Sequence, residues 1–518
     1  MDRHRRGRRG AGEPARAAAR DHHRAGRAAG PGRRRRPGHG DDEGQAPDGR
    51  RSEGAAGDRV VNPARAVVVA APSSGSGKTT VSTGLMAALS RRGTRVAPFK
   101  VGPDYIDPGY HTLAAGRPGR NLDVVLQGTH RLAPLARHGA AGADVAVVEG
   151  VMGLFDGRIA DGAGSTAQVA SALGAPVVLV VDVRGQSRSL AALLHGFRSF
   201  DPSVQVAGVI LNRVGSDRHT EVCRAAADEV GLPVLGAVPR RAELAVPSRH
   251  LGLVTAAEHG SAATAAVDAM AELVAAHVDL DAVLALARPL PDGPAWDPAA
   301  ETAAAGPVPD AGERPVVALA GGPAFGFGYA EHAELLAAAG AEVAVVDPLR
   351  DPSLPDRTAA LVLPGGFPEE HVGALGENAS LRSGVARLAA SGAPVHAECG
   401  GLLYLCRDLD GTPMCGVLDA SAAMTPRLTL GYRDAVAVSG SAPFPAGARV
   451  GAHEFHRCAV TPRAGAAPAW VWRGGEPEGY VVDGVHASFL HTHPAGVPEA
   501  VARFVAAARG ATTAPASP

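Results

Sequence analysis

The sequence predicts an α/β protein that contains two open, mostly parallel-sheet domains. From Arg65 onward, short Val-rich runs alternate with Ala- and Leu-rich segments of helical period. Each run is continuously apolar, which is typical of strands that are covered on both faces. Strands that alternate with helices indicate βαβ units and a parallel sheet. The expected strands are 66–71, 145–148, 177–181 and 206–211 in the first domain, and 316–320, 343–346, 361–363 and 394–397 in the second.

Composition divides the chain into four segments. Residues 1–60 are Arg-rich and have no apolar periodicity, so we expect a disordered tail there. Residues 61–285 form the first predicted domain, residues 286–314 a Pro- and Ala-rich linker, and residues 315–510 the second domain. Two other interpretations of the tail stay open: a basic arm for nucleic acid, or a misassigned start codon with the real protein beginning near Val60. The tail lacks the apolar core of a signal peptide.

The bulk composition argues against several classes of protein. The chain has 518 residues, a formal net charge of -1, and 46% hydrophobic but only 4% aromatic residues. A charge near zero creates no field that steers the protein to nucleic acid or a membrane. No apolar run approaches the roughly 18–20 residues that cross a bilayer, and the five irregularly spaced cysteines form no disulfide framework. We therefore expect a cytoplasmic enzyme that acts on small molecules, with a homodimer left open.

A glycine-rich loop follows the first predicted strand and precedes a predicted helix at 81–90. Its glycines let backbone amides face phosphate oxygens, and the helix N-terminus adds partial positive charge. Lys78 can reach the β- and γ-phosphates, and the Thr79 hydroxyl can ligate Mg²⁺. Pro72 replaces the first Gly of the strict motif, and a plain Gly/Ser turn is the alternative. We expect ATP to bind Ser74, Gly75, Ser76, Gly77, Lys78, Thr79 and Thr80.

Acidic residues cluster where predicted strands end. Asp104 and Asp107 flank a short turn that prolines restrict, Glu149 follows the strand 145–148, and Asp156 lies in the Gly-rich segment after it. Ligands bind at the carboxyl edge of an open α/β sheet, so Glu149 is well placed for the Mg²⁺ of the nucleotide. Each acid alone fits a helix cap or a turn equally well. Four of them beside a phosphate loop favour a site.

The segments 72–80, 100–108, 121–123 and 148–157 resemble the amino-terminal domain of the cobyrinate and hydrogenobyrinate a,c-diamide synthases. That family is similar in fold to dethiobiotin synthetase, and the resemblance covers residues from about 65 to 505. Its specific part is the run Lys-Val-Gly-Pro-Asp-Tyr-Ile-Asp-Pro. The resemblance implies that Asp104, Asp107, Glu149 and Asp156 surround ATP, Mg²⁺ and a corrin carboxylate.

A candidate nucleophile, Cys399, lies between the predicted strand 394–397 and a predicted helix at 402–406. The run Glu-Cys-Gly-Gly predicts a strand, a tight turn and a helix whose N-terminus favours the thiolate. The other four cysteines lack this context, and we interpret them as small buried hydrophobes. The amides of Gly366, in Leu-Pro-Gly-Gly-Phe-Pro-Glu, and of Gly400 can form an oxyanion hole. A structural Gly-Gly turn is the alternative.

The base for this thiol must be a His that is distant in sequence. Class I glutamine amidotransferases carry it in a late strand exit, and the run Ser-Phe-Leu-His is similar to the family's Ser-Tyr-Leu-His, which implies His491. The usual Glu two residues later is replaced by His493, so the resemblance implies a Cys–His dyad, with His493 as the fallback base. The segment 451–456, Gly-Ala-His-Glu-Phe-His, also matches the family. A contact with glutamine and a structural role stay open for it.

Together the motifs imply ATP- and glutamine-dependent amidation of the a and c acetate carboxylates of a corrin ring, in cobalamin biosynthesis. A carboxylate and ammonia do not condense unaided, so ATP must form an acyl phosphate. Cys399 releases ammonia from glutamine through a thioester. The alternatives are a cobyric acid synthase, which amidates other side chains, and a ParA-like switch ATPase with a degenerate amidotransferase module. The sequence leaves open whether the ring already holds cobalt.

Overall fold

The computed structural model of the protein describes residues 64–240, 248–249, 252–253, 256, 260–304 and 314–513. The predicted tail and the alternative start near Val60 lie outside these residues. Within the described ranges, no helix combines the length and the hydropathy that a bilayer span requires.

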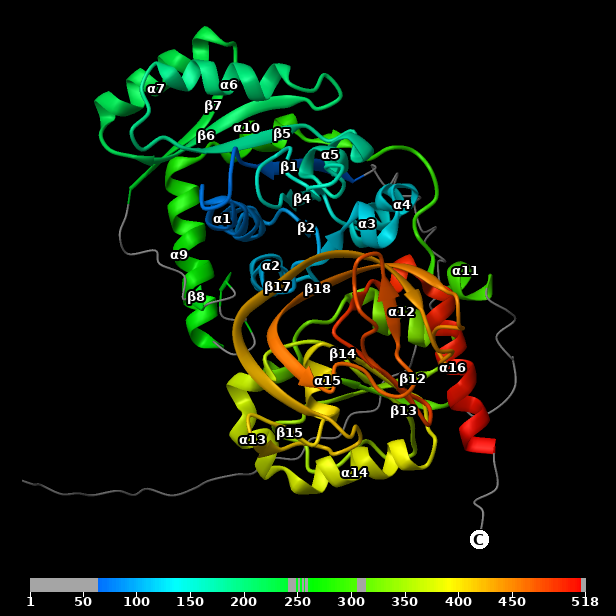
Figure 1. Cartoon of the computed structure of the whole chain (residues 1–518). Helices are drawn as coiled ribbons and strands as arrows, with labels where there is room; N and C mark the ends of the chain where they lie inside the picture. The colour runs from blue at the N-terminus through cyan, green and yellow to red at the C-terminus, as the bar shows by residue number, and fades with distance from the viewer. Residues whose placement is uncertain are drawn as a thin grey trace, which may run out of the picture. The chain divides into compact units, whose positions relative to one another are not determined.

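The first half of the chain is an open parallel sheet with helices on both faces (Figure 1). Its strands are β1 (Arg65–Ala70), β2 (Val96–Val101), β3 (Arg120–Leu122), β4 (Val145–Glu149), β5 (Val177–Asp182), β6 (Val206–Val214), β7 (Val234–Pro239) and β10 (Arg288–Pro289). The strand order is β3-β2-β4-β1-β5-β6-β7, and every pairing along it is parallel. Only β10 is antiparallel among these strands, and it pairs with β1.

The helices of this half are α1 (Lys78–Arg91), α2 (Asp107–Ala115), α3 (Val124–Gln127), α4 (Thr129–Gly139), α5 (Thr166–Leu173), α6 (Ser189–Ser199), α7 (Asp217–Glu229), α9 (Ser261–His277) and α10 (Leu280–Leu286). A short antiparallel pair, β8 (Ser248–Arg249) and β9 (Gly252–Leu253), precedes α9. In Figure 1, α6 and α7 lie on one face of the sheet and α1 and α9 on the other.

Alternate residues of each strand belong to different cores, as the continuous apolar runs predicted. Val68 packs in the same cluster as Leu194 of α6. Its neighbour Val67 packs with Leu85 of α1 and Val274 of α9. Because successive side chains of a strand point to opposite faces, a strand between two helical layers needs apolar residues at every position. The predicted fold class of this half is confirmed.

The second half contains another mostly parallel sheet, with the order β12-β11-β13-β14-β21-β20. Its strands are β11 (Val316–Ala320), β12 (Glu342–Val346), β13 (Thr358–Leu363), β14 (Val395–Glu398), β20 (Tyr480–Val482) and β21 (Val485–Ser488). All pairings are parallel except that of β20 with β21. Its helices are α12 (Ala330–Ala338), α13 (Val372–Glu377), α14 (Ala379–Ala390), α15 (Gly400–Leu405) and α16 (Pro498–Thr513), with 3-10 turns η1 (Pro323–Phe325), η2 (Pro368–His371) and η3 (Pro494–Gly496).

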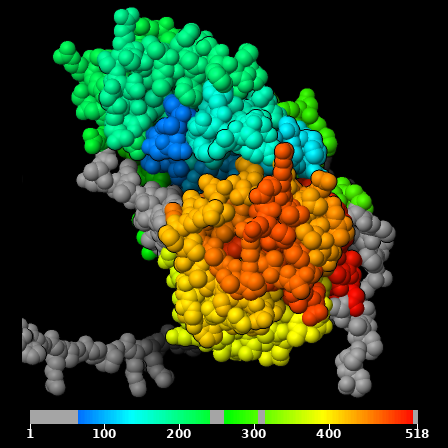
Figure 2. Space-filling model, viewed as in Figure 1, coloured from blue at the N-terminus to red at the C-terminus, as the bar shows by residue number. Residues whose placement is uncertain are grey.

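A further sheet in this half was not predicted from the sequence. Its strands are β15 (Asp408–Leu409), β16 (Thr412–Pro413), β17 (Ser421–Ala437), β18 (Arg449–Thr461), β19 (Trp470–Trp472) and β22 (His491–Thr492). The long antiparallel pair β17 and β18 dominates it. In Figure 2 its atoms are yellow-orange to orange and lie at the surface. Most residues of β17 are exposed or half-buried, so this strand has no continuous apolar run that could reveal it.

The segment predicted as a linker, 286–314, begins with ordered structure. It carries β10, then the short helix α11 (Pro298–Ala303). Trp296 between them is 3% exposed and packs edge-on against His138 of the first half, with ring centroids 5.0 Å apart. The domain boundaries stay predictions, but the first part of this segment packs against the sheet of the first half.

Buried polar contacts join the two halves. The guanidinium of Arg120 at the start of β3 donates to the carboxylate of Glu331, at 2.7 Å, and also pairs with Glu334, both on α12. Burial of the guanidinium lowers its pKa, but the hydrogen bonds and charges of the two carboxylates have a larger effect, and the pKa of Arg120 is raised. The Tyr432 hydroxyl on β17 donates to Asp123 at 2.7 Å. Such paired groups are costly to separate once water is excluded, so they favour contact between these two segments of the chain.

Candidate active site

The glycine-rich loop lies between β1 and α1, as predicted. A Cβ atom at Gly77 would lie 2.2 Å from the Asn212 amide nitrogen, and φ at Gly77 is 93°, so this position requires glycine. The Lys78 ammonium, 7% exposed, donates to the carbonyls of Ser73 (3.4 Å) and Met152. The loop therefore holds a buried cation where a phosphate-binding lysine is required.

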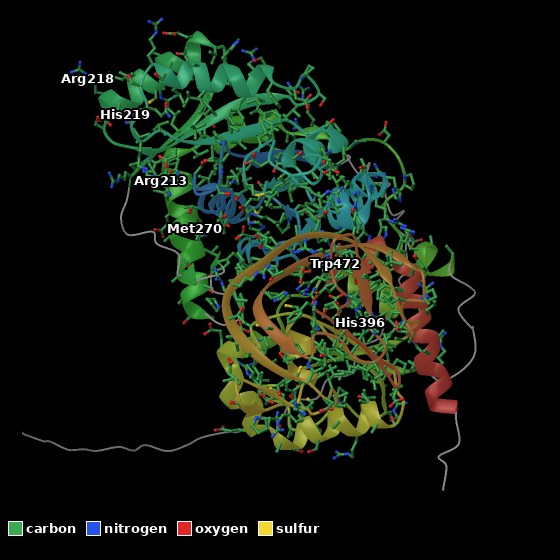
Figure 3. The ribbon with its side chains drawn as sticks, viewed as in Figure 1. Arg213, Arg218, His219, Met270, His396 and Trp472 are labelled. Atoms are coloured by element: carbon green, nitrogen blue, oxygen red, sulfur yellow. The ribbon has the colours of Figure 1, made fainter. Side chains whose placement is uncertain are left out.

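Two residues near the end of β6 support this loop, although β5 lies between β6 and β1 in the sheet. The Asn212 amide donates to the Ser76 carbonyl at 2.8 Å. The Arg213 guanidinium, labelled in Figure 3, donates to the Gly75 carbonyl at 2.8 Å and pairs with Asp182. The sequence did not reveal these two contacts, because the residues around Asn212 and Arg213 do not indicate that their side chains reach the phosphate loop.

Glu149 is the centre of a buried polar network beside the loop. Its carboxylate accepts hydrogen bonds from Thr79 (2.7 Å) and Ser82 (2.6 Å), and it lies 2.8 Å from the Lys100 ammonium and 2.7 Å from His111 Nε2. Burial raises its pKa, but Lys100 and His111 outweigh burial and hold the pKa of Glu149 well below its usual range. An ionised carboxylate thus contacts the hydroxyl that would ligate Mg²⁺.

Asp107 belongs to the same network, and Asp104 lies at its edge. The Asp107 carboxylate accepts from Lys100 at 2.6 Å and from Thr79 at 3.3 Å. Burial, together with the nearby charge of Asp104, raises the pKa of Asp107 to about 7. Asp104 accepts from the backbone amides of Ile106 (2.8 Å) and Asp107 (3.0 Å). Asp104 therefore shapes the turn, and its other oxygen lies 3.9 Å from Lys100.

The remaining predicted nucleotide and acidic residues have more peripheral places. Asp156 accepts from the Gly153 amide at 2.9 Å, which shapes the loop after β4. Ser74 is exposed at the tip of the phosphate loop, and Thr80 is half-buried in the first turn of α1. The structure thus brings Lys78, Thr79, Asp107 and Glu149 together and leaves Asp156 and Ser74 nearer the rim.

Three members of the network were missed by sequence reasoning: Lys100, His111 and Ser82. Lys100 could have been recognised, because it lies in a strand whose residues are otherwise apolar and all buried. A buried lysine needs a carboxylate or another acceptor as its partner. Burial lowers its pKa, but Asp107 and Glu149 outweigh burial, and the net effect raises the pKa of Lys100. No comparable signal marks His111 or Ser82, which are ordinary residues of helices.

Cys399 occupies the turn between β14 and α15, in the predicted strand–turn–helix arrangement. Its φ of 48° is unusual for a residue with a side chain, and the residue is 4% exposed. The Cys399 amide donates to the Ser488 carbonyl at 2.7 Å, which joins the turn to the segment that carries the late histidines. Burial, with smaller contributions from Cys458 and Glu369, raises the pKa of Cys399 well above its ordinary value. A base that takes the thiol proton is therefore needed for the reactive thiolate to form.

His491 lies on β22 against the glycine turn after β13. A Cβ atom at Gly365 would lie 2.4 Å from His491 Cε1, so the imidazole occupies the space of a missing side chain. Neither ring nitrogen has a hydrogen-bond partner within the described residues. Burial lowers the pKa of His491 to about 4, so the imidazole is neutral at neutral pH, the form that a general base requires.

The two glycines predicted for the oxyanion hole are neighbours. A Cβ atom at Gly400 would lie 2.9 Å from the Gly366 amide nitrogen, and one at Gly366 would lie 2.0 Å from the Ala324 carbonyl oxygen. Both positions therefore exclude any larger residue. The close approach places two backbone segments side by side next to the nucleophile, as an oxyanion hole requires.

His493 has different neighbours from His491. Its Nε2 lies 2.8 Å from the side-chain nitrogen of Gln127 on α3, and its ring lies 4.0 Å from that of Tyr329. Gln127 belongs to the first half of the chain. His493 thus contacts α3 of the first half, whereas His491 lies at the glycine turn after β13.

The segment 451–456 lies on β18 and reaches the region of the nucleophile. The Phe455 carbonyl oxygen is 3.9 Å from the Cys399 sulfur. His456 stacks on Phe489 with ring centroids 3.8 Å apart, and its Nε2 lies 3.1 Å from Glu454. His453 faces Tyr432 across the pair β17 and β18, with centroids 5.4 Å apart. The segment therefore supports the region around the nucleophile.

The acidic turn of the first half contacts the candidate base of the second. Tyr105, between Asp104 and Asp107 in the chain, lies 5.1 Å from His491 between ring centroids. It also stacks on Phe327, with centroids 5.0 Å apart. A single short turn thus touches the nucleotide network on one side and the thiol site on the other.

A cavity of about 660 Å³ opens beside this turn. Its walls come from the acidic turn, the loop after β4 and the pair β17 and β18. Several wall residues are apolar and exposed, including Met152 (42% exposed) and Leu430 (56% exposed). Two guanidinium groups also line the cavity: that of Arg158 pairs with Asp161, and that of Arg433 pairs with Glu454. The other main wall residues are Pro103, Asp104, Tyr105, Ile106, Val151, Ile159, Phe327, Tyr432, His453 and Phe455.

Fold and site together define a glutamine amidotransferase joined to a nucleotide-binding domain with a phosphate loop. The description "CobQ/CobB/MinD/ParA nucleotide binding domain" matches residues 67–254, and "CobB/CobQ-like glutamine amidotransferase domain" matches residues 316–497.

Relatives of the whole chain identify the family. The chain is 60% identical to a hydrogenobyrinate a,c-diamide synthase of Mycobacterium tuberculosis, strain H37Rv, over 85% of this chain and 97% of the relative. It is 58% identical to the enzyme of that name from Streptomyces coelicolor (85% and 96% covered) and 43% identical to a cobyrinate a,c-diamide synthase from Gloeobacter violaceus (85% and 96% covered). The chain belongs to the family of hydrogenobyrinate and cobyrinate a,c-diamide synthases, which confirms the resemblance found in its motifs.

Proposed function

We propose that the protein uses ATP and glutamine to convert the a and c acetate carboxylates of hydrogenobyrinate or cobyrinate into amides. The observation that carries this proposal is the turn of Asp104, Tyr105 and Asp107. This turn borders the phosphate loop, the cavity and the thiol site at once. A ligase that activates a carboxylate with ATP and then delivers ammonia to it needs these three places to adjoin.

The corrin substrate binds in the 660 Å³ cavity. A corrin is a broad, largely apolar ring with carboxylates on its rim. Met152 and Leu430 offer apolar surface to the ring, while Arg158 and Arg433 can pair with carboxylates that are not reacting. Asp104 lines this cavity and also lies at the edge of the nucleotide network, which supports an approach of the reacting carboxylate at this point.

Activation of the carboxylate takes place next to the phosphate loop. The carboxylate oxygen attacks the γ-phosphorus of ATP, ADP leaves, and an acyl phosphate forms. Lys78 neutralises the transferred negative charge. A magnesium ion would be held by Thr79 Oγ1 and Glu149, whose oxygens lie 2.7 Å apart, and it would supply further charge neutralisation on the phosphates. Phosphate oxygens of the nucleotide would supply its further ligands.

Ammonia is produced at Cys399. His491 takes the thiol proton as the sulfur attacks the amide carbon of glutamine, and the amides of Gly366 and Gly400 bind the resulting oxyanion. The proton passes to the leaving nitrogen, ammonia departs, and water hydrolyses the thioester to glutamate. Ammonia then attacks the acyl phosphate, which gives the amide and inorganic phosphate.

The test is synthesis by the purified protein with ATP, Mg²⁺ and glutamine, supplied with either metal-free hydrogenobyrinate or cobalt-bearing cobyrinate. We expect product masses that correspond to two carboxyl-to-amide conversions, with no further conversion on longer incubation. Amidation beyond two positions would indicate a cobyric acid synthase. ATP hydrolysis without any amide product would indicate a switch ATPase and refute the proposal.

A further inference from the structure

The proposed glutaminase lacks the acidic residue that usually follows its histidine. Position 493, two residues after His491, is a histidine that is already engaged: its Nδ1 accepts from the Ala495 amide at 3.2 Å, and its Nε2 contacts Gln127. A buried imidazole that acts as a base needs a partner to fix its tautomer and to stabilise its protonated form. His493 is not in a position to do this for its neighbour.

Another carboxylate lies beside His491. Glu398, the last residue of β14 and the residue before the nucleophile, is 7% exposed. Its Oε1 accepts from the amide and the hydroxyl of Thr492, at 3.0 Å and 2.8 Å, and lies 3.2 Å from Nε2 of His396, which Figure 3 labels. Its Oε2 lies 3.8 Å from His491 Nδ1. One oxygen is therefore anchored, and the other points toward the candidate base.

We propose that Glu398 is the positioning residue for His491, with its carboxylate holding the Nδ1–H tautomer so that Nε2 accepts the proton of Cys399. The nucleophile turn then supplies both the thiol and the acidic partner of the base, in place of a residue after the histidine. This inference rests on the proposed glutaminase chemistry at Cys399.

The separation between Glu398 and His491 is compatible with this role. A distance of 3.8 Å exceeds a normal N–H···O hydrogen bond. Catalytic hydrogen bonds are often long before the substrate binds and shorten in the reacting complex. Thr492 anchors the carboxylate through its other oxygen, so Oε2 stays directed at His491, and a rotation of the imidazole toward Oε2 would shorten this distance.

The charge state of Glu398 also fits. Burial raises its pKa, but the hydrogen bond and charge of His396, together with His491 and the Thr492 amide, lower the pKa of Glu398 to about 2. The carboxylate is ionised at neutral pH. It raises the pKa of His491, against the larger opposing effect of burial. A negative charge at Nδ1 favours the imidazolium that forms when the thiol gives up its proton.

Other charged and titratable groups also face His491. A pH experiment must distinguish their effects on the pKa of His491 from the effect of Glu398. From β18, Glu454 raises its pKa, while His456 on the same strand lowers it. His453 is the cross-strand neighbour of His491, and the phenol of Tyr105 lies 5.1 Å from its ring. Among the described residues, the carboxylate that lies within 4 Å of a His491 nitrogen is that of Glu398.

The experiment compares Glu398→Gln with the wild type. Glutamine keeps the volume and can still accept hydrogen bonds from Thr492, but it carries no charge. We expect glutamine hydrolysis to lose at least about 100-fold in kcat, with KM for glutamine little changed, since base catalysis contributes roughly that much. The acid limb of kcat/KM should move to lower pH, because the charge that raises the pKa of His491 is gone. Synthesis from added ammonia should be retained.

Two further variants keep the test decisive. Glu398→Asp retains the charge and should hydrolyse glutamine faster than Glu398→Gln. Thr492→Val removes one anchor of the carboxylate without removing its charge, and it should cost only a few-fold. The idea is overturned if Glu398→Gln hydrolyses glutamine within about three-fold of wild type, if its acid limb does not move, or if the Asp and Gln variants are equally impaired. Failure of the wild type to hydrolyse glutamine would instead refute the proposed function.

Discussion

Replacement of Lys100 by methionine tests the buried network that links the two carboxylates of the nucleotide site. The ammonium lies 2.6 Å from Asp107 and 2.8 Å from Glu149 and has a side-chain exposure of 5%. Methionine fills most of the volume of the lysine stem but leaves the two carboxylates without their cation. Removal of one partner from a buried ion pair costs about 3–5 kcal/mol, because the remaining charge cannot be solvated. We expect Lys100→Met to lose free energy of unfolding in this range at pH 8.

The pH dependence of this loss gives a sharper criterion. Without Lys100, the pKa values of Asp107 and Glu149 in the folded state rise above those of the unfolded chain. The folded variant then binds more protons than the unfolded variant, so its stability increases as the pH falls. The difference between variant and wild type should therefore shrink between pH 8 and pH 5.5.

The assay is urea unfolding followed by far-ultraviolet circular dichroism at both pH values. The double variant Lys100→Met/Asp107→Asn is the matched control, because it removes one negative charge together with the positive one. It should recover part of the lost stability at pH 8. A loss below about 1 kcal/mol for Lys100→Met, a gap that widens toward acid, or no recovery in the double variant would refute the account of this network.

Three predictions concern the glutamine site. Cys399→Ala should abolish glutamine-dependent synthesis and leave synthesis from added ammonia; equal loss with both nitrogen sources would contradict separate sites. His491→Ala should lower glutamine hydrolysis by at least about 100-fold, and His493→Ala much less, as measured by glutamate release; a reversed order would make His493 the base. Gly365→Ala places a Cβ atom 2.4 Å from His491 Cε1 and should impair glutamine hydrolysis. The control is Gly373→Ala, whose Cβ atom meets no atom within 4 Å and which should hydrolyse glutamine normally. Similar rates in both variants would show that the position of the His491 ring is not critical.

Much of the fold was accessible from sequence because burial on both faces of a parallel strand leaves a local mark. The Val-rich runs of β1 and β5 are continuous, and a phosphate loop directly follows the first of them. The third sheet has no such continuous apolar run in the long strand β17. Residues of β17 are largely exposed, and their pairing with β18 satisfies backbone groups without a run of apolar side chains.

Local chemistry was likewise determined by the sequence alone. A phosphate loop needs glycines, a lysine and a hydroxyl within a few residues, and a nucleophile turn needs a small residue directly after the cysteine. Both requirements are met by consecutive positions, so Lys78 and Cys399 could be singled out before any contact was known.

The tertiary structure decided which distant side chains meet these local motifs. His491 and His493 are two residues apart in similar surroundings, yet one lies at Gly365 and the other at Gln127 of the first half. Glu398 was visible in the sequence only as the residue before the cysteine, and its approach to His491 depends on the pairing of β14 with β21. The physical reason is the distance along the sequence over which each effect acts. Backbone propensity and turn chemistry depend on a few neighbouring residues. Electrostatic partners are determined by the packing of strands that are far apart in the sequence.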